Sequence, residues 1–167
     1  VVWNLKPEKD KSKSTALQSD YRLLDFKMTA FNEQGQESFS LTAPKLERDP
    51  AGKTVTVTKP VFTFPNENNE LWTARSDTAW VADKAREVQL RDNVTMLGPV
   101  SEQNLQIQLV TQKLTVFPKE NRIIGTDWVK ISYGDSIMKG LGVEADIKQH
   151  HVQLLSKVQV HYAAKSL

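Results

Sequence analysis

The side chains of this sequence that could perform acid–base or metal chemistry are few and scattered. The three histidines are His150, His151 and His161. Successive residues of a strand point to opposite faces, so His150 and His151 could share a metal ion only within a turn. His161 alternates out of phase with its apolar neighbours, which is typical of an exposed strand residue. The sequence has no cysteine, which excludes a disulfide framework, a thiolate nucleophile and a cysteine-based zinc site.

Acidic and glycine motifs also give no reactive centre. Glu8 and Asp10 lie in a linker-like segment, and Glu67 and Glu70 lie in a turn, where solvated charge is the ordinary role of a carboxylate. The Gly140-x-Gly142 spacing follows the wrong element for a dinucleotide fingerprint, and no phosphate loop, nucleophile elbow or HExxH motif is present. The sequence therefore predicts no catalytic residue, no metal, no cofactor and no enzyme. A hydrolytic or carbohydrate-active enzyme without a motif is the least favoured alternative.

Length and composition fit one folded domain. The 167 residues are 39% hydrophobic and 25% charged, with a formal net charge of +2. These values are typical of a globular chain with one core. The charges of both signs are mixed along the sequence, and nucleic-acid binding would need a basic stripe. Nucleic acid is therefore not an expected partner.

The amino-terminal residues carry a separate signal. Val1-Val2-Trp3 is followed by Asn4, Leu5 and a charged run from Glu8 to Lys13. An apolar end, an interfacial tryptophan and a basic flank are typical of the last turn of a membrane helix, and a frayed start with one stray tryptophan is the alternative. No later segment offers about 18 consecutive apolar residues. We expect residues 1–20 to be the end of a membrane anchor plus a linker, and residues 21–167 to be the folded domain.

The elements that must position any site are strands. From Tyr21 onward, apolar residues recur at every second position, for example in Lys53–Val61 and Leu105–Leu109. This alternation is typical of half-buried strands. Turn sequences such as Asn32-Glu33-Gln34-Gly35 separate the runs at short spacing. The sequence predicts an all-β, antiparallel domain.

A weak internal repeat suggests how these strands are arranged. Val61, Val94, Val129 and Val158 follow one another at intervals of about 30 residues, which is a length typical of stacked supersecondary units. Each interval corresponds to one long hairpin. Stacked hairpins should form two facing sheets whose inner faces carry the alternating apolar side chains.

Two interpretations of that interior remain open. A tightly closed sandwich is one, and a jellyroll held open as an apolar groove is the other. Each acyl CH₂ buried in such a groove contributes about 0.8 kcal/mol, so a groove could bind lipid tightly. The last predicted strand, Val152–Tyr162, has no proline or glycine and one charged residue, Lys157. It is either a poorly protected edge that can pair with another chain or an ordinary strand paired on both sides.

Several segments together resemble the LptC family of lipopolysaccharide transport proteins. They are the Asn32-x-x-Gly35 turn before Phe39–Ala43, the strand end Thr58–Val61 and the segment Lys139–Ala145. The resemblance extends from about Tyr21 to Ala163. It implies a twisted, open antiparallel β-jellyroll of the OstA/LptA type, with two facing sheets around a groove. It also implies a periplasmic domain that is anchored to the bacterial inner membrane by an amino-terminal helix.

The resemblance further implies a function and partners. Such a protein binds the acyl chains of lipopolysaccharide between its sheets, receives the lipid from the inner-membrane ABC transporter and passes it to LptA. The amino-terminal edge and the anchor would face the transporter, and the carboxy-terminal edge would face LptA. The same free edges could join two copies of the chain as a homodimer. The alternative function is a closed β-sandwich adaptor without a lipid site of its own.

Carried onto this sequence, the resemblance gives three sets of candidate residues. The acyl-chain contacts are expected at Phe26, Met28, Val57, Ile107, Val152 and Tyr162. The edge that binds LptA is expected at Val158, Val160 and Tyr162. Structural glycines, where a Cβ would hinder a turn or a close approach, are expected at Gly35, Gly140 and Gly142.

Overall fold

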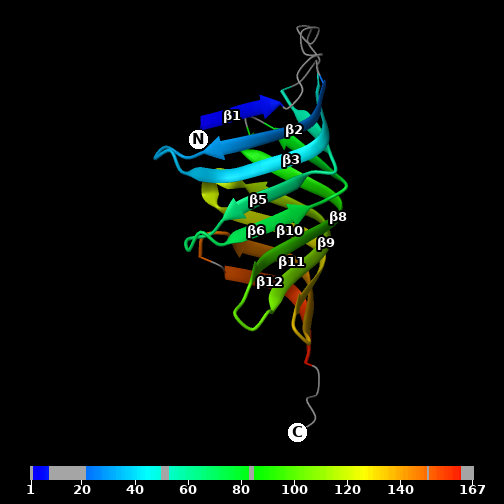
Figure 1. The fold of residues 1–167 in the computed structure, drawn as a ribbon. Coiled ribbons are helices and arrows are strands. Elements are labelled where there is room, and N and C mark those ends of the chain that lie inside the picture. Colours follow the sequence, from blue (N-terminus) through cyan, green and yellow to red (C-terminus); the bar gives the residue numbers. More distant parts are fainter. Residues whose placement is uncertain (1, 8–21, 50–52, 83–84, 150, 163–167) are drawn as a thin grey trace.

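The computed structural model describes residues 2–7, 22–49, 53–82, 85–149 and 151–162. In these residues nearly all of the backbone is β-strand, and Figure 1 shows the strands stacked from the amino-terminal strands at the top of the view toward β12 near its bottom. The strands are β1 Val2–Pro7, β2 Arg22–Phe31, β3 Glu37–Arg48, β4 Val55–Thr58, β5 Val61–Pro65, β6 Leu71–Arg75, β7 Thr78–Ala82, β8 Glu87–Val100, β9 Gln106–Phe117, β10 Arg122–Tyr133, β11 Ser136–Asp146 and β12 His151–His161. A 3₁₀ turn, η3 Pro118–Glu120, joins β9 to β10.

The strands form one antiparallel, 12-stranded sheet that follows the order of the chain. β4 and β5 are the two halves of one bent strand, because β3 pairs with β5 through Ser40–Thr42 and with β4 through Lys45–Arg48. β6 and β7 are likewise two halves of the next strand, and both pair with β8. The result is a meander in which each bent strand is hydrogen-bonded to its neighbours in sequence.

Bends near the middle of the long strands fold this meander into two layers. Positive φ angles occur at Asp25 in β2, Lys59 between β4 and β5, Asp92 and Asn93 in β8, and Lys157 in β12. The pairing register of β8 shifts at Asp92 and Asn93, as expected for a bulge, which adds residues to one strand and bends it.

Neighbouring bends satisfy each other's polar groups. The Lys59 N–H donates to the Asp77 carbonyl (2.8 Å), and the Asp77 N–H donates to the Asp92 carbonyl (2.9 Å). The Asn93 side-chain amide donates to the Asp77 carboxylate at 2.8 Å. The bends of three successive strands (β4/β5, β6/β7 and β8) are therefore hydrogen-bonded to one another, as backbone groups freed from the ladder require.

The inner faces of the two layers meet in one apolar core. We call the half of the sheet that contains β5 and β6 the β5/β6 layer, and the half that contains β4 and β7 the β4/β7 layer. The core is one cluster, whose largest fully buried side chains include Leu41, Leu90, Leu114, Val57 and Val143. The alternation of apolar and polar residues along strands such as β3 places one face of each layer in this core.

The predicted all-β jellyroll is confirmed, with one added detail of its construction. The two facing layers belong to one continuous sheet, since the long strands run from one layer into the other. The repeated valines mark this feature: Val61, Val94 and Val158 lie one or two residues after a bend residue with positive φ, and Val129 follows a register shift in β10. The repeat therefore reports where successive strands change layer.

The amino-terminal segment is part of the sheet, whereas the sequence analysis predicted that it lies outside the folded domain. Residues 2–7 form β1, which pairs with β2 from Val2 opposite Phe31 to Pro7 opposite Phe26. β1 covers only the part of β2 that belongs to the β5/β6 layer. Val1 and residues 8–21, the rest of the expected anchor end and linker, lie outside the described residues.

Candidate functional site

A large hollow lies between the ends of the two layers. This mouth cavity has a volume of about 1090 Å³, slightly above the usual range for small-molecule sites. Its apolar floor comes from both layers and consists of Phe39, Phe62, Phe64, Ala74, Val88, Leu90, Val116 and Ile147. The Phe39 and Phe62 rings lie 6.0 Å apart between centroids in a tilted arrangement, a distance typical of favourable aromatic pairs. An apolar ligand could enter between the layers here.

Two matching turns build one lip of the mouth cavity, which we call the upper lip (residues 32–38 and 65–71). The Asn32 side-chain oxygen accepts hydrogen bonds from the N–H groups of Gln34 and Gln36, both at 2.9 Å. Asn66 does the same for Asn68 and Glu70, at 2.8 and 3.0 Å. An asparagine that bonds its own turn in this way fixes the loop conformation. The predicted turns are thus rigid edges of the cavity.

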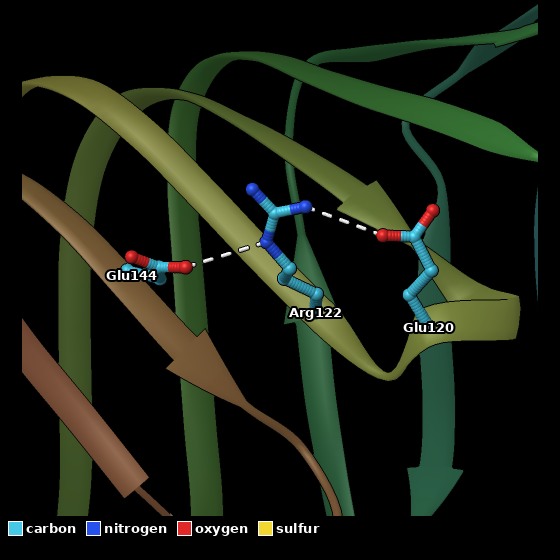
Figure 2. A network of polar contacts seen from close by, with 3 residues as sticks. All are labelled: Glu120, Arg122 and Glu144. Carbon is cyan, nitrogen blue, oxygen red and sulfur yellow. Dashed lines mark hydrogen bonds and ion pairs between the residues drawn. The ribbon is translucent and has the colours of Figure 1, made fainter.

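The facing lip, which we call the lower lip (residues 118–121 and 147–148), joins two further turns. The Ile147 N–H donates to the Asn121 carbonyl at 2.8 Å. Figure 2 shows how Arg122 holds this lip: its guanidinium contacts Glu120 at 3.2 Å and Glu144 at 3.3 Å. The same guanidinium lies 5.7 Å from the Phe117 ring centroid, within cation–π range. These contacts connect η3 to β10 and β11.

A second, small cavity continues the interlayer space away from the mouth. Its volume is about 20 Å³, close to what one water molecule requires, so the layers are nearly closed there. Phe64 and Ile147 line both cavities, one from each layer. They therefore stand at the constriction between the mouth cavity and the closed interior.

The inner face becomes exposed again at the carboxy-terminal edge of the sheet. One cross-strand row crosses β9, β10, β11 and β12, and its members are Leu109, Ile131, Met138 and Val160. Their exposed fractions rise in that order from 5% and 8% to 36% and 43%. The β5/β6 layer thus presents an uncovered apolar margin at this edge.

The predicted acyl-contact residues are distributed over three environments. Phe26 and Val57 are buried in the core and line neither cavity, and Met28 packs partly buried against that core. Ile107 and Val152 both line the small inner cavity. Tyr162 lies just beyond β12 and is 76% exposed. Of the six residues, only Ile107 and Val152 line a common cavity.

The acyl-contact residues predicted from the sequence did not include the floor of the mouth cavity. Phe62, Phe64, Val116 and Ile147 had no assigned role, although all are apolar residues near a predicted turn. Inward parity close to a turn was the available signal, because residues at strand ends line the rim of an interlayer space. Three of the residues chosen instead, Phe26, Met28 and Val57, belong to the core or pack against it.

The other predicted positions occupy the expected elements. Val158 and Val160 are exposed on β12, which pairs with β11. Gly35 has φ +81°, and a Cβ on it would meet no other atom within 4 Å. Gly142 has φ +87°, and a Cβ there would meet Leu155 at 3.1 Å. A Cβ on Gly140 would meet Leu154 at 3.1 Å.

Groups that could hold a metal ion are not assembled in the described part of the chain. No cluster of three or more histidine, cysteine, aspartate or glutamate residues occurs among the described residues. His151 and His161 stand at the two ends of β12, and His150, Glu8 and Asp10 lie outside the described residues. Within the same ranges no helix has the length and apolar character needed to cross a membrane.

Comparisons with known proteins agree with this architecture. The family model described as "Lipopolysaccharide-assembly, LptC-related" matches residues 1–163. No curated protein sequence matches the chain. Among solved structures, the chain is similar to LptH of Pseudomonas aeruginosa, described as the LptA-homologous periplasmic component of the conserved lipopolysaccharide transport device. That match has 11% identity and a TM-score of 0.58, and it covers 75% of this chain and 95% of the other.

Proposed function

The chain belongs to the LptC-related lipopolysaccharide-assembly family, and from that premise we propose that it carries lipopolysaccharide with the acyl chains between its two layers. The observation that supports this proposal is the mouth cavity, about 1090 Å³ in volume, with its floor of phenylalanine and aliphatic side chains. Burial of acyl chains against such a floor is favourable, because each CH₂ contributes about 0.8 kcal/mol. The sugars would remain in water at the polar lips.

In this proposal the acyl chains advance by parting the layers. Phe64 and Ile147 separate to connect the mouth cavity with the inner cavity, where Ile107 and Val152 make the next contacts. Phe26, Met28 and Val57 come into contact with lipid only if the layers open further, since protein covers them or packs on them here. The row from Ile131 to Val160, which becomes exposed from Met138 onward, then leads to the carboxy-terminal edge.

The two edges of the meander would serve as docking sites in the periplasm. We assign the β12 edge, with Val158, Val160 and Tyr162, to a following jellyroll of the LptA type. An exposed edge strand can pair with the strand of another protein. The β1 edge, and an amino-terminal membrane anchor, would face the inner-membrane transporter that supplies the lipid.

Photo-crosslinking in cells tests the cargo and its location. Leu71 and Leu24 are a matched pair: both are 54% exposed, but only Leu71 lines the mouth cavity. A photo-reactive residue at Leu71 or at Val152 should capture lipopolysaccharide, and one at Leu24 should not. If Leu71 and Val152 capture only proteins, the adaptor function replaces transport.

Deletions test the docking edge. Removal of residues 158–167 takes away the end of β12 and should weaken binding to LptA while leaving transporter binding intact. Tyr162→Pro should act in the same direction, because proline lacks the N–H that an added strand would bond. Removal of residues 163–167 alone keeps β12 and is the control. Equal LptA affinity for all three variants and the unaltered chain would contradict the assignment.

A further inference from the structure

The two lips of the mouth cavity carry opposite charges. The upper lip contributes Glu33, Glu37 and Glu67 to the cavity lining, and the lower lip contributes Lys119 and Lys148. All five side chains belong to exposed residues. The remaining polar lining residues are uncharged, so a ligand in the mouth meets a negative side and a positive side.

The two lysines are available to a ligand because the nearby carboxylates are otherwise engaged. Glu120 and Glu144 both contact the Arg122 guanidinium (Figure 2). The Asp146 carboxylate accepts a hydrogen bond from the Gln149 N–H at 2.9 Å. Among the described residues, neither Lys119 nor Lys148 forms an ion pair within 4.0 Å.

The lysines are also held on the same lip by the backbone. Lys119 lies in η3, which ends at Asn121, and Lys148 follows Ile147. The hydrogen bond from the Ile147 N–H to the Asn121 carbonyl joins these two turns. Two ammonium groups therefore flank the lower side of one apolar opening, where the aliphatic stems can lie along the cavity and the charges can remain in water.

From this arrangement we propose that the mouth binds a phosphorylated glycolipid in one orientation, with an anionic group on Lys119 and Lys148 and sugar hydroxyls toward Glu33, Glu37 and Glu67. An ammonium group attracts phosphate, and a carboxylate accepts hydrogen bonds from hydroxyls but repels phosphate. The apolar floor holds the acyl chains. This inference rests on the proposed function, since it assigns the head-group orientation of the same cargo.

Soluble amphiphiles of equal chain length separate the charge effect from the apolar effect. The chain has no cysteine, so Gln34→Cys on the upper lip gives a single thiol for an environment-sensitive fluorophore. The labelled protein is titrated with dodecyl phosphate and with dodecyl maltoside, both below their micelle concentrations, at low salt. Inorganic phosphate is titrated separately to test an anion without a tail.

The expected result is a preference for dodecyl phosphate that depends on the lower lip. The double variant Lys119→Gln/Lys148→Gln should lose about tenfold in dodecyl phosphate affinity, the effect of two exposed ion pairs, and keep its dodecyl maltoside affinity. Glu33→Gln/Glu67→Gln should raise dodecyl phosphate affinity. The control Lys113→Gln/Lys130→Gln removes the same charge from exposed residues outside the cavity lining and should change neither affinity.

Four outcomes would overturn the inference. Equal binding of both amphiphiles, or an equal loss in the lower-lip and control variants, would refute the orientation while leaving an apolar lipid site in place. Binding of inorganic phosphate as tight as that of dodecyl phosphate would show an anion site unrelated to the apolar floor. Binding of neither amphiphile would refute the inference and count against the proposed function as well.

Discussion

Two cross-strand rows on the inner face differ in burial although their sequences follow the same alternation. The row through β4 and β7 is fully closed, and its members are Leu46, Val57, Ala79, Leu90 and Leu114. The row that ends on β12 opens progressively from Leu109 to Val160. Both rows consist of apolar residues at inward positions, so residue type alone does not determine burial.

The difference arises from what faces each row. The closed row belongs to strands that have neighbours on both sides and an opposing layer above them. The open row reaches the last strand of the meander, where no further strand of the described chain continues the sheet. One part of the inner face therefore provides stability, whereas the mouth and the β12 margin retain exposed apolar surface, which is typical of binding sites.

The largest loss of stability is expected when a glutamate is placed in the closed row. The same substitution in the open row is the comparison. Val57→Glu puts a carboxylate in a fully buried position and should destabilise the fold by about 3–5 kcal/mol, because no partner compensates the buried charge. Val160→Glu is exposed and should change stability by less than about 0.5 kcal/mol. Urea unfolding of both variants measures the difference. Comparable losses would show that the β12 margin is as tightly packed as the core.

An intermediate effect is expected from two glycines, one in the upper lip and one at the carboxy-terminal edge. Gly142→Ala adds a Cβ at positive φ and against Leu155, whereas Gly35→Ala meets only the backbone penalty in an open turn. That penalty is about 1–2 kcal/mol for an alanine, and the Gly142 variant should lose more than the Gly35 variant. Thermal unfolding under identical conditions compares the two. A larger loss at Gly35 would contradict the close approach of β11 and β12.

The smallest loss of stability is expected from the exposed ion-pair network at the lower lip. Arg122→Gln removes the contacts to Glu120 and Glu144, which are exposed, so the free energy of unfolding should fall by less than about 1 kcal/mol. The loss should shrink further as salt is added, since salt screens exposed pairs. Arg22→Gln, which removes a contact to Glu47 away from the mouth, is the matched control. A loss of several kcal/mol would show that this network is a main support of the fold.

Sequence reasoning reached the class of fold and the turns because both depend on local rules. Period-two alternation predicted the strands, and the Asn32 and Asn66 turns have the hydrogen bonds that their residue types indicate. The repeated valines are visible in the sequence, but only the folded structure shows that they mark the places where strands change layer. A bend at Lys59 or Asp92 depends on φ angles and register shifts that no alternation pattern contains.

The candidate site was predictable only in part. Ile107 and Val152 were predicted as acyl-chain contacts, and both line the inner cavity; their contact with lipid stays a prediction. Phe62 and Ile147 were missed, because their role depends on which turns of the two layers face each other. That pairing is a property of the folded meander and is set by strand length and bend position rather than by the identity of either residue.

The meander connectivity has a consequence for how quickly the chain acquires its structure. Each bent strand pairs with the strands before and after it in sequence, so the ladder contacts have shorter sequence separations than crossover connections would give. Folding rates rise as the mean separation of contacting residues falls. We expect this chain to fold faster than sandwiches of equal length with Greek-key crossovers, and hairpins at its amino-terminal end can form during synthesis before the last strands have left the ribosome.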